Sequence, residues 1–138
     1  MAGLVPNAGK GLAIKAFLNH TAPQDQELKL FVNNYTPVDG STAANFTEMS
    51  TQGYASKALT GTSWAPDPGP PYSAVYAQQT WTFDGTGGAT TVYGYYVVQA
   101  GSGELMFAER FGTPPTIANN GDQIKLTPTI FIADEDND

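Results

Sequence analysis

The chain has 138 residues, with thirteen acidic and six basic side chains, a net charge of −7 and no cysteine. This length suits one domain with its own hydrophobic core, and the lack of cysteine excludes disulfides, cysteine-ligated metals and thiol nucleophiles. The shortage of Lys and Arg argues against nucleic-acid binding, which relies on clustered basic groups, and no apolar run approaches the ~18 residues of a membrane span.

Residues 1–11 are rich in glycine and are predicted to form an N-terminal arm. They lack the charged start and the continuous apolar run of a signal peptide, so we expect the mature chain to begin at or next to Met1. The arm contains "NAGKG", which only superficially resembles a phosphate-binding loop. Leu4 stands where that motif needs glycine and Gly11 where it needs Ser or Thr, so no nucleotide site is expected.

Alternating apolar and polar residues predict a series of strands in residues 12–132. Segments with Gly, Pro, Asn and Asp separate them, and these residues favour turns. One short helical turn is expected in "STAANFTEM", capped by Ser41 or Thr42. The expected strands lie in "GLAIKAFL", "ELKLFVNN", residues 54–60, "SAVYAQQTWTF", the two halves of residues 90–112, and "DQIKLTPTIFI".

About seven to eight short antiparallel strands without a helical repeat predict an all-β fold, a β-sandwich with jelly-roll-like topology. Pro128 lies within the last expected strand and indicates an edge or a bulge there. The domain is expected to span residues 12–132. An acidic tail, residues 133–138, follows it and holds four of the thirteen acids.

The stretch "TTVYGYYVVQAGSGELMFAERFG", residues 90–112, is apolar on both faces when it is read with the period of a strand. One face is expected to form the sandwich core. The other would be exposed in a monomer unless something covers it. Both the chain's own loops and another protein chain are open candidates for that cover.

Catalytic and metal-binding patterns are weak in this sequence. The single histidine, His20, lies in an expected turn, and most carboxylates fall in turns or at strand ends. Glu109 and Arg110 are exceptions, because adjacent strand residues point to opposite faces and one of the two should point inward or into an interface. We expect no enzyme activity, cofactor or metal, with a bound calcium ion and a small glycosidase or lyase kept as alternatives.

Several segments together resemble a family of structural proteins. The series "LKLFVNNYTP", "FTEMSTQGYASKALTG", "YAQQTWTF", "YGYYVVQAGSGELMFAERF" and "NNGDQIKLTPTIFI" is similar in order and spacing to small β-rich virion proteins of tailed bacteriophages. The likeness covers about residues 27–132 and rests on strand and turn signatures. It implies a structural role in the particle, without fixing head or tail, in a virion assembled in the bacterial cytoplasm.

Within this family, we expect a capsid decoration, or cement, protein that bridges subunits of the major capsid protein. It would act as a homo-oligomer such as a trimer, with the spare face of residues 90–111 packed on a sister copy and both chain ends reaching neighbours. The expected partner-binding residues are Leu4, Val5, Lys10, Tyr93, Tyr95, Phe107, Glu109, Arg110, Asp134, Glu135, Asp136 and Asp138.

The alternative is a carbohydrate-binding module of a phage tail fibre or spike. Its sugar-stacking candidates are Trp64, Trp81, Tyr93 and Tyr95. Aromatic rings suit this role when they form an exposed, flat row.

Overall fold

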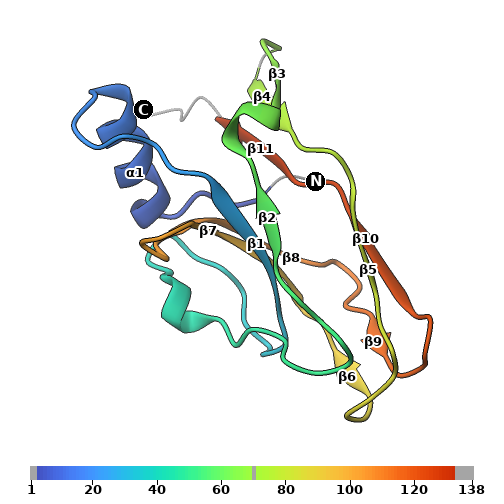
Figure 1. Cartoon of the computed structure of the whole chain (residues 1–138). Coiled ribbons are helices and arrows are strands. Elements are labelled where there is room, and N and C mark those ends of the chain that lie inside the picture. Colours follow the sequence, from blue (N-terminus) through green and yellow to red (C-terminus); the bar gives the residue numbers. More distant parts are fainter. Residues whose placement is uncertain (1–2, 70, 133–138) are drawn as a thin grey trace.

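A computed structural model describes residues 3–69 and 71–132, and most of the regular structure in them is antiparallel β-sheet (Figure 1). The predicted all-β, sandwich-like class is confirmed, while a jelly-roll order stays a prediction. The elements are α1 (Asn7–Phe17), β1 (Gln26–Phe31), η1 (Ala43–Asn45), β2 (Lys57–Leu59), η2 (Gly61–Ser63), β3 (Ala65–Asp67), β4 (Tyr72–Val75), β5 (Gln79–Thr82), β6 (Thr90–Thr91), β7 (Gly94–Gln99), β8 (Leu105–Arg110), β9 (Thr116–Ile117), β10 (Gln123–Leu126) and β11 (Thr129–Ile132).

One layer of the sandwich is a four-stranded sheet with the order β2-β1-β7-β8. β1 and β7 pair along their whole length, from Gln26 opposite Gln99 to Phe31 opposite Gly94. Leu28 and Leu30 alternate on the inward face of β1 and are fully buried. The sequence pattern therefore set the orientation of this strand correctly.

The other layer is built mainly from two segments far apart in the sequence. β4 and β5 run antiparallel to β11 and β10, and β3 adds a third strand at one end (Figure 1). Val75 lies opposite Thr129 and Gln79 opposite Leu126, so the β4–β5 side contains one extra residue. This bulge lies beside Pro128, for which the sequence predicted an edge or a bulge, and β11 is also an edge strand of its sheet.

The strand expected in "GLAIKAFL" is wrong, because α1 occupies this segment. Ala, Leu and Lys favour helix, and a β-branched residue occurs only once, at Ile14. Leu12, Ala13 and Ala16 follow Gly9 at helical spacing and line the cavity beside β8. Gly9 is needed for the close approach, since a Cβ there would lie 1.9 Å from the backbone oxygen of Met106.

The described part of the predicted N-terminal arm lies against the sandwich. The backbone N–H of Leu4 donates to Ala108 of β8 at 2.7 Å, and the N–H of Ala108 donates back at 2.9 Å. Gly3 donates to Thr129 of β11 at 3.2 Å. Residues 3 and 4 therefore join the two layers at one side, and the expected boundary at residue 11 falls inside α1.

Both faces of the four-stranded sheet are covered by the chain itself. The inner face contributes Leu30, Val97 and Phe107 to the core between the layers. The outer face carries a second cluster around Tyr96, and the segment 32–47 folds over it. The chain's own loop thus covers the spare face, and the expectation that a sister copy packs there is wrong.

The covering segment is fixed by aromatic packing and by a short helical turn. Phe46 stacks on Tyr96 with ring centroids 4.7 Å apart and meets Phe31 edge-on at 4.9 Å. The expected turn is present as η1, where the N–H of Thr42 donates to Oδ1 of Asn45 at 2.8 Å. This turn places Phe46 over the sheet.

Candidate interaction site

The outward side of α1 carries the most exposed large apolar side chains among the described residues. Ile14, Phe17 and Leu18 have exposed fractions of 60%, 89% and 67%. Their spacing of three and four residues puts them on one side of the helix end. We call Ile14, Phe17 and Leu18 the helix patch. Such a cluster on a surface indicates a binding site more strongly than scattered apolar residues do.

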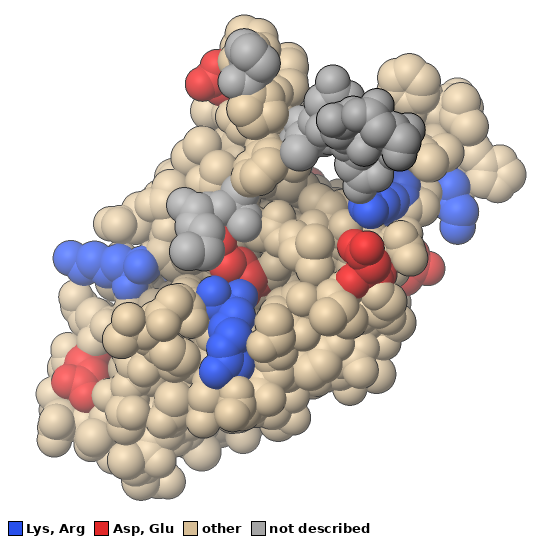
Figure 2. Space-filling model, turned by 180° about the vertical axis from the view of Figure 1, so that it is seen from behind, with Lys and Arg blue, Asp and Glu red and all other residues tan. Residues whose placement is uncertain are grey.

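Charges of both signs lie near the helix patch, since Asp39 pairs with Lys10 and Glu104 lines a pocket together with Lys15. Lys10 and Lys15 lie on α1, and residues 3–24 contain no acid. Figure 2 shows charged side chains thinly spread over the face behind Figure 1, with basic and acidic ones both present on the side where α1 lies. Lys10 also forms an exposed ion pair with Asp39 at 3.9 Å.

A second exposed apolar surface lies on the sheet β11-β4-β3. Ala65, Val75 and Thr129 form one row across the three strands, and Asp67, Ser73 and Phe131 form the next row of the same face. Val75 and Phe131 are 36% and 39% exposed, and Ala65 is exposed. We call Ala65, Val75 and Phe131 the sheet patch.

A cavity of about 190 Å³ lies beneath α1. Its walls come from the inward side of the helix, from residues 21–24 and Gln26, and from Met106 and Ile130. None of the described residues that line it has an ionisable side chain, so these residues offer no acid or base for chemistry.

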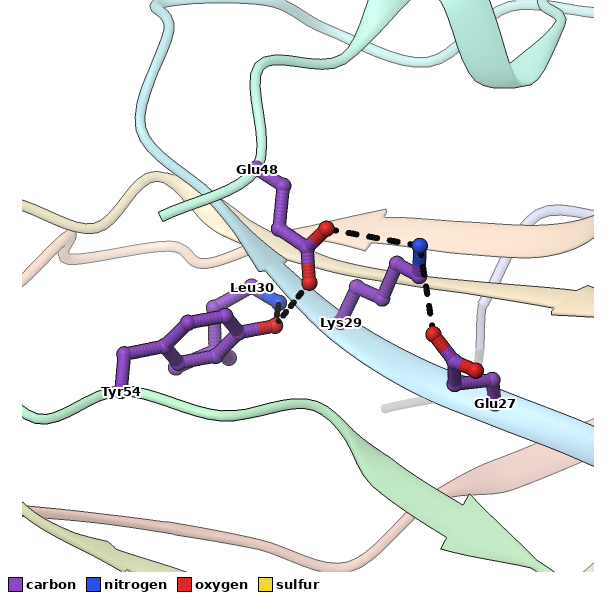
Figure 3. Close-up of polar contacts among 5 residues, drawn as sticks. All are labelled: Glu27, Lys29, Leu30, Glu48 and Tyr54. Carbon is purple, nitrogen blue, oxygen red and sulfur yellow. Dashed lines mark hydrogen bonds and ion pairs between the residues drawn. The ribbon is translucent and has the colours of Figure 1, made fainter. Parts of the chain in front are cut away.

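The clearest polar cluster lies on the outer side of β1 (Figure 3). Nζ of Lys29 is 3.2 Å from Oε1 of Glu27 and 3.4 Å from Oε1 of Glu48. Tyr54 donates its hydroxyl hydrogen to Oε2 of Glu48 at 2.8 Å and accepts the N–H of Leu30 at 3.1 Å. The lysine fills the space between the carboxylates, so the cluster fastens the segment around Glu48 and Tyr54 to β1.

The environment shifts the pKa of two groups in this cluster. Burial, and then the bond to Glu48 and its charge, raise the pKa of Tyr54 far above its usual value. Partial burial lowers the pKa of Lys29, but the hydrogen bond to Glu27 and the charge of Glu48 outweigh it and raise the pKa overall. Both shifts keep the proton on the group, which suits a structural contact.

Glu109 and Arg110 lie on opposite sides of β8, as expected for neighbours in a strand. Glu109 is the register partner of Tyr95, and its Oε2 is buried. Burial raises the pKa of Glu109. Arg110 donates from Nη1 to the backbone oxygen of Tyr35 at 3.2 Å and lies 5.0 Å from the centre of the Tyr93 ring. Arg110 therefore holds the covering segment 32–47 onto the sheet.

The structure separates the residues expected to bind partners. Tyr95 and Phe107 have exposed fractions of 0% and 1%, so their assignment to a partner surface is wrong: both rings belong to the core. Leu4 is exposed, whereas Val5 packs against the core. The remaining expected residues of the tail, Asp134, Glu135, Asp136 and Asp138, lie outside the described residues.

The sequence interpretation missed the helix patch because it assigned the strand period to "GLAIKAFL". The signal was present in the spacing of Ile14, Phe17 and Leu18, which form one cluster only on a helix.

The four rings proposed for sugar stacking form no exposed row. Trp81 is 4% exposed and, like Tyr95, belongs to the core. Trp64 donates its indole N–H to Oε1 of Gln26 at 2.8 Å and packs edge-on against Phe107. Tyr93 is half-buried beneath Arg110.

The acids of the two loops considered for calcium each satisfy their own turn. Oδ1 of Asp84 accepts the N–H and the hydroxyl of Thr86 at 2.9 and 2.6 Å. Oδ2 of Asp122 accepts the N–H groups of Ala118 and Asn119 at 3.0 and 2.9 Å. In the described ranges, no group of three or more His, Asp or Glu side chains is placed to share a metal ion.

Comparison with known proteins gives no relative: neither a protein-family model nor a curated protein matches this chain. No helix in the described part of the chain is long and apolar enough to cross a membrane.

Proposed function

We propose that this protein is a virion structural protein of a tailed bacteriophage, and that it decorates the capsid as a cement protein. The observation that carries the proposal is the pair of exposed apolar patches on a sandwich that otherwise covers its own faces. The resemblance of residues 27–132 to small phage virion proteins is the reason for assigning the protein to a phage particle. Binding, rather than catalysis, is what such surfaces provide.

The mechanism is mass action on the capsid lattice. A protein that binds assembled capsid subunits, but not separated ones, stabilises the assembled state by its binding free energy. Symmetry repeats each contact many times, so individually weak sites add up to a strong effect. We propose that the protein acts as a homo-oligomer, with the major capsid protein as its partner and the virion as its location.

Purified particles with and without this protein test the proposal. We expect bound copies in the hundreds per particle, and a lower temperature of DNA release in particles that lack the protein. Equal survival of both kinds of particle under heat and low salt would contradict the cement function. A copy number of six or twelve would indicate that the protein is located in the tail or portal instead of on the head.

A variant makes this test specific to the exposed patches. Phe17→Ser is expected to weaken protection of the particle, because it removes the most exposed apolar ring of the helix patch. Val38→Ser is the matched control, since Val38 is 54% exposed but belongs to neither patch. If both variants protect equally well, the helix patch takes no part in the function.

A further inference from the structure

We propose that the cavity beneath α1 is a binding site for a small neutral amphiphile, such as a medium-chain alcohol. Such a molecule has an apolar body and one oxygen that accepts a hydrogen bond. The proposal concerns the inward side of α1 and goes beyond the proposed function. It rests on the size and apolar walls of the cavity, on a buried amide that lacks a partner, and on the charges outside the cavity.

The cavity has the size of a small organic molecule. Its volume is about 190 Å³, and an apolar cavity of ~150 Å³ holds one benzene molecule. A ligand of about six to eight non-hydrogen atoms therefore fits the space. The walls include Val5, Leu12, Ala16, Met106 and Ile130. The flexible side chain of Met106 can adjust to the shape of the ligand.

Most polar groups in the walls are engaged elsewhere or exposed. Oε1 of Gln26 accepts the indole N–H of Trp64 at 2.8 Å, and its Nε2 donates to the backbone oxygen of Gln24 at 2.8 Å. Thr21 and Gln24 are exposed. A buried water needs about two to four polar partners, whereas an apolar cavity stays dry and binds apolar molecules. The walls therefore favour a ligand with an apolar body.

Gln99 supplies one free hydrogen-bond donor at this site. It is 7% exposed and lines both the cavity and the groove that adjoins it. Its Oε1 accepts the hydroxyl hydrogen of Ser102 at 3.0 Å, while its Nε2 donates to no group in the described part of the chain. A buried donor without an acceptor costs free energy, and an oxygen of the ligand would remove this cost. The ligand therefore needs an acceptor beside its apolar body.

The groove outside the cavity disfavours a ligand with a net charge. Leu12, Gln24 and Gln99 line both spaces, so the groove leads to the cavity. Lys15 and Glu104 line the groove but not the cavity. Lys15 would attract an anion that Glu104 repels, and a cation would meet the reverse, so neither charge gains much. A neutral polar group is therefore expected.

Titration of the full chain with 1-hexanol, followed by NMR of the backbone amides, is the first test. We expect saturable shifts around the cavity, with a dissociation constant on the order of 1 mM for so few non-hydrogen atoms. The charged analogues hexanoate and hexylamine should bind at least about threefold more weakly. The proposal is wrong if hexanol binding does not saturate up to its solubility limit, or if either charged analogue binds as tightly.

Ala16→Leu tests the location of the site, because Ala16 is half-buried and lines the cavity. The larger side chain should fill the space and weaken hexanol binding about tenfold or more, without lowering the melting temperature. Ala8→Leu is the matched control, since it adds the same atoms to α1 at a position that does not line the cavity. Phe17→Ser should bind like the wild type, which separates the cavity from the helix patch. Unchanged binding in Ala16→Leu, or lost binding in Phe17→Ser, would refute the location.

Gln99→Met tests the hydrogen bond, since methionine keeps the length of the side chain but has no donor. We expect hexanol to bind about tenfold more weakly to this variant, because the bond is lost. Benzene, which needs no donor, should keep its affinity. Equal losses for both ligands would show that Gln99 only shapes the cavity, and would overturn its assigned role. Amide spectra of the free variants establish that they are folded.

The outcomes for this site and for the proposed function are distinguishable. A chain that protects particles but does not bind hexanol would refute this site and leave the cement function standing. A chain that binds hexanol in the cavity but gives particles no protection would do the reverse.

Discussion

At the scale of single residues, Gly94 shows how tightly β7 is packed. A Cβ on Gly94 would lie 2.2 Å from the backbone oxygen of Glu109 and 2.7 Å from the ring of Phe31. Gly94→Ala is therefore expected to lower the free energy of unfolding by about 1–3 kcal/mol, the usual cost of overpacking. Urea denaturation measures this. Gly112→Ala, where a Cβ meets nothing within 4 Å, should lose far less, and equal losses would refute the packing argument.

Tyr54 connects β1 to the segment that crosses it. Without its hydroxyl, the half-buried N–H of Leu30 loses its acceptor and Glu48 loses a donor. Tyr54→Phe should lower the free energy of unfolding by about 1–2 kcal/mol, because unsatisfied polar groups are costly. Tyr72→Phe is the matched control, since Tyr72 is 53% exposed. A change no larger than in the control would mean that water replaces the tyrosine hydroxyl.

Sequence reasoning at this scale succeeded where the rule is local. The opposite directions of Glu109 and Arg110 follow from strand geometry alone and were predicted. The partner of Arg110, the backbone oxygen of Tyr35, lies 75 residues away and depends on the path of the covering segment. Spacing in the sequence carries no information about such a contact.

At the scale of elements, α1 was the principal error, and Gly9 explains how it packs. Gly9→Ala would push a methyl group into the backbone of β8, so we expect a loss of about 1–3 kcal/mol in the free energy of unfolding. Gly11→Ala meets nothing within 4 Å and should gain about 0.5–1 kcal/mol from its better helix propensity. Thermal melts of the two variants should therefore shift in opposite directions, and a shift of both in one direction would refute this docking.

The segment 32–47 is the second element that can be tested. Phe46→Ala removes a ring that is 7% exposed and stacked on Tyr96, so we expect a loss of about 3–5 kcal/mol. The loosened cover should also expose the apolar outer face of the sheet, which binding of the dye ANS would report. Thr36→Ala, at an exposed position of the same segment, should change neither quantity.

The sequence predicted the strands better than it predicted which segment covers the outer face of the four-stranded sheet. β1 shows clear alternation, whereas β7 and β8 are apolar on both faces, and all three strands lie where the sequence placed them. That pattern also showed that a second face needed cover, but not whether a loop or a sister copy supplied it. The answer depended on Phe46 and Tyr35, whose aromatic rings look like ordinary loop residues until the segment is seen folded over Tyr96.

At the scale of the whole molecule, the free energy of unfolding should fall at alkaline pH. Lys29, Tyr54, Tyr95 and Tyr96 all have a raised pKa in the folded protein. The folded state therefore holds these protons more firmly than the unfolded state does. Their contribution is complete below the unfolded pKa values, near 10, and is lost as pH rises through the folded ones.

Urea denaturation at pH 8, 9.5 and 11 would measure this dependence. We expect the free energy of unfolding to fall from pH 9.5 to 11, and to fall less in Tyr54→Phe, which has one such group fewer. A free energy that stays constant up to pH 11 would contradict the burial of these tyrosines.

The whole fold shows where the sequence stops being informative. The all-β class follows from alternation and turns, which are local. The order of strands does not, because β4 pairs with β11 across more than fifty residues and residue 4 pairs with residue 108. Which strands pair depends on how the two layers of the sandwich pack against each other.

The contacts of residues 3 and 4 have a mechanical consequence. The start of the described chain is bonded to the last strand through Gly3 and Thr129, and to β8 through Leu4 and Ala108. A force that pulls the two chain ends apart therefore loads these few bonds before it reaches the long ladders of β1 and β7. In an optical-tweezers experiment, the chain should yield first by a short release of its beginning, with the sheets rupturing later and at higher load.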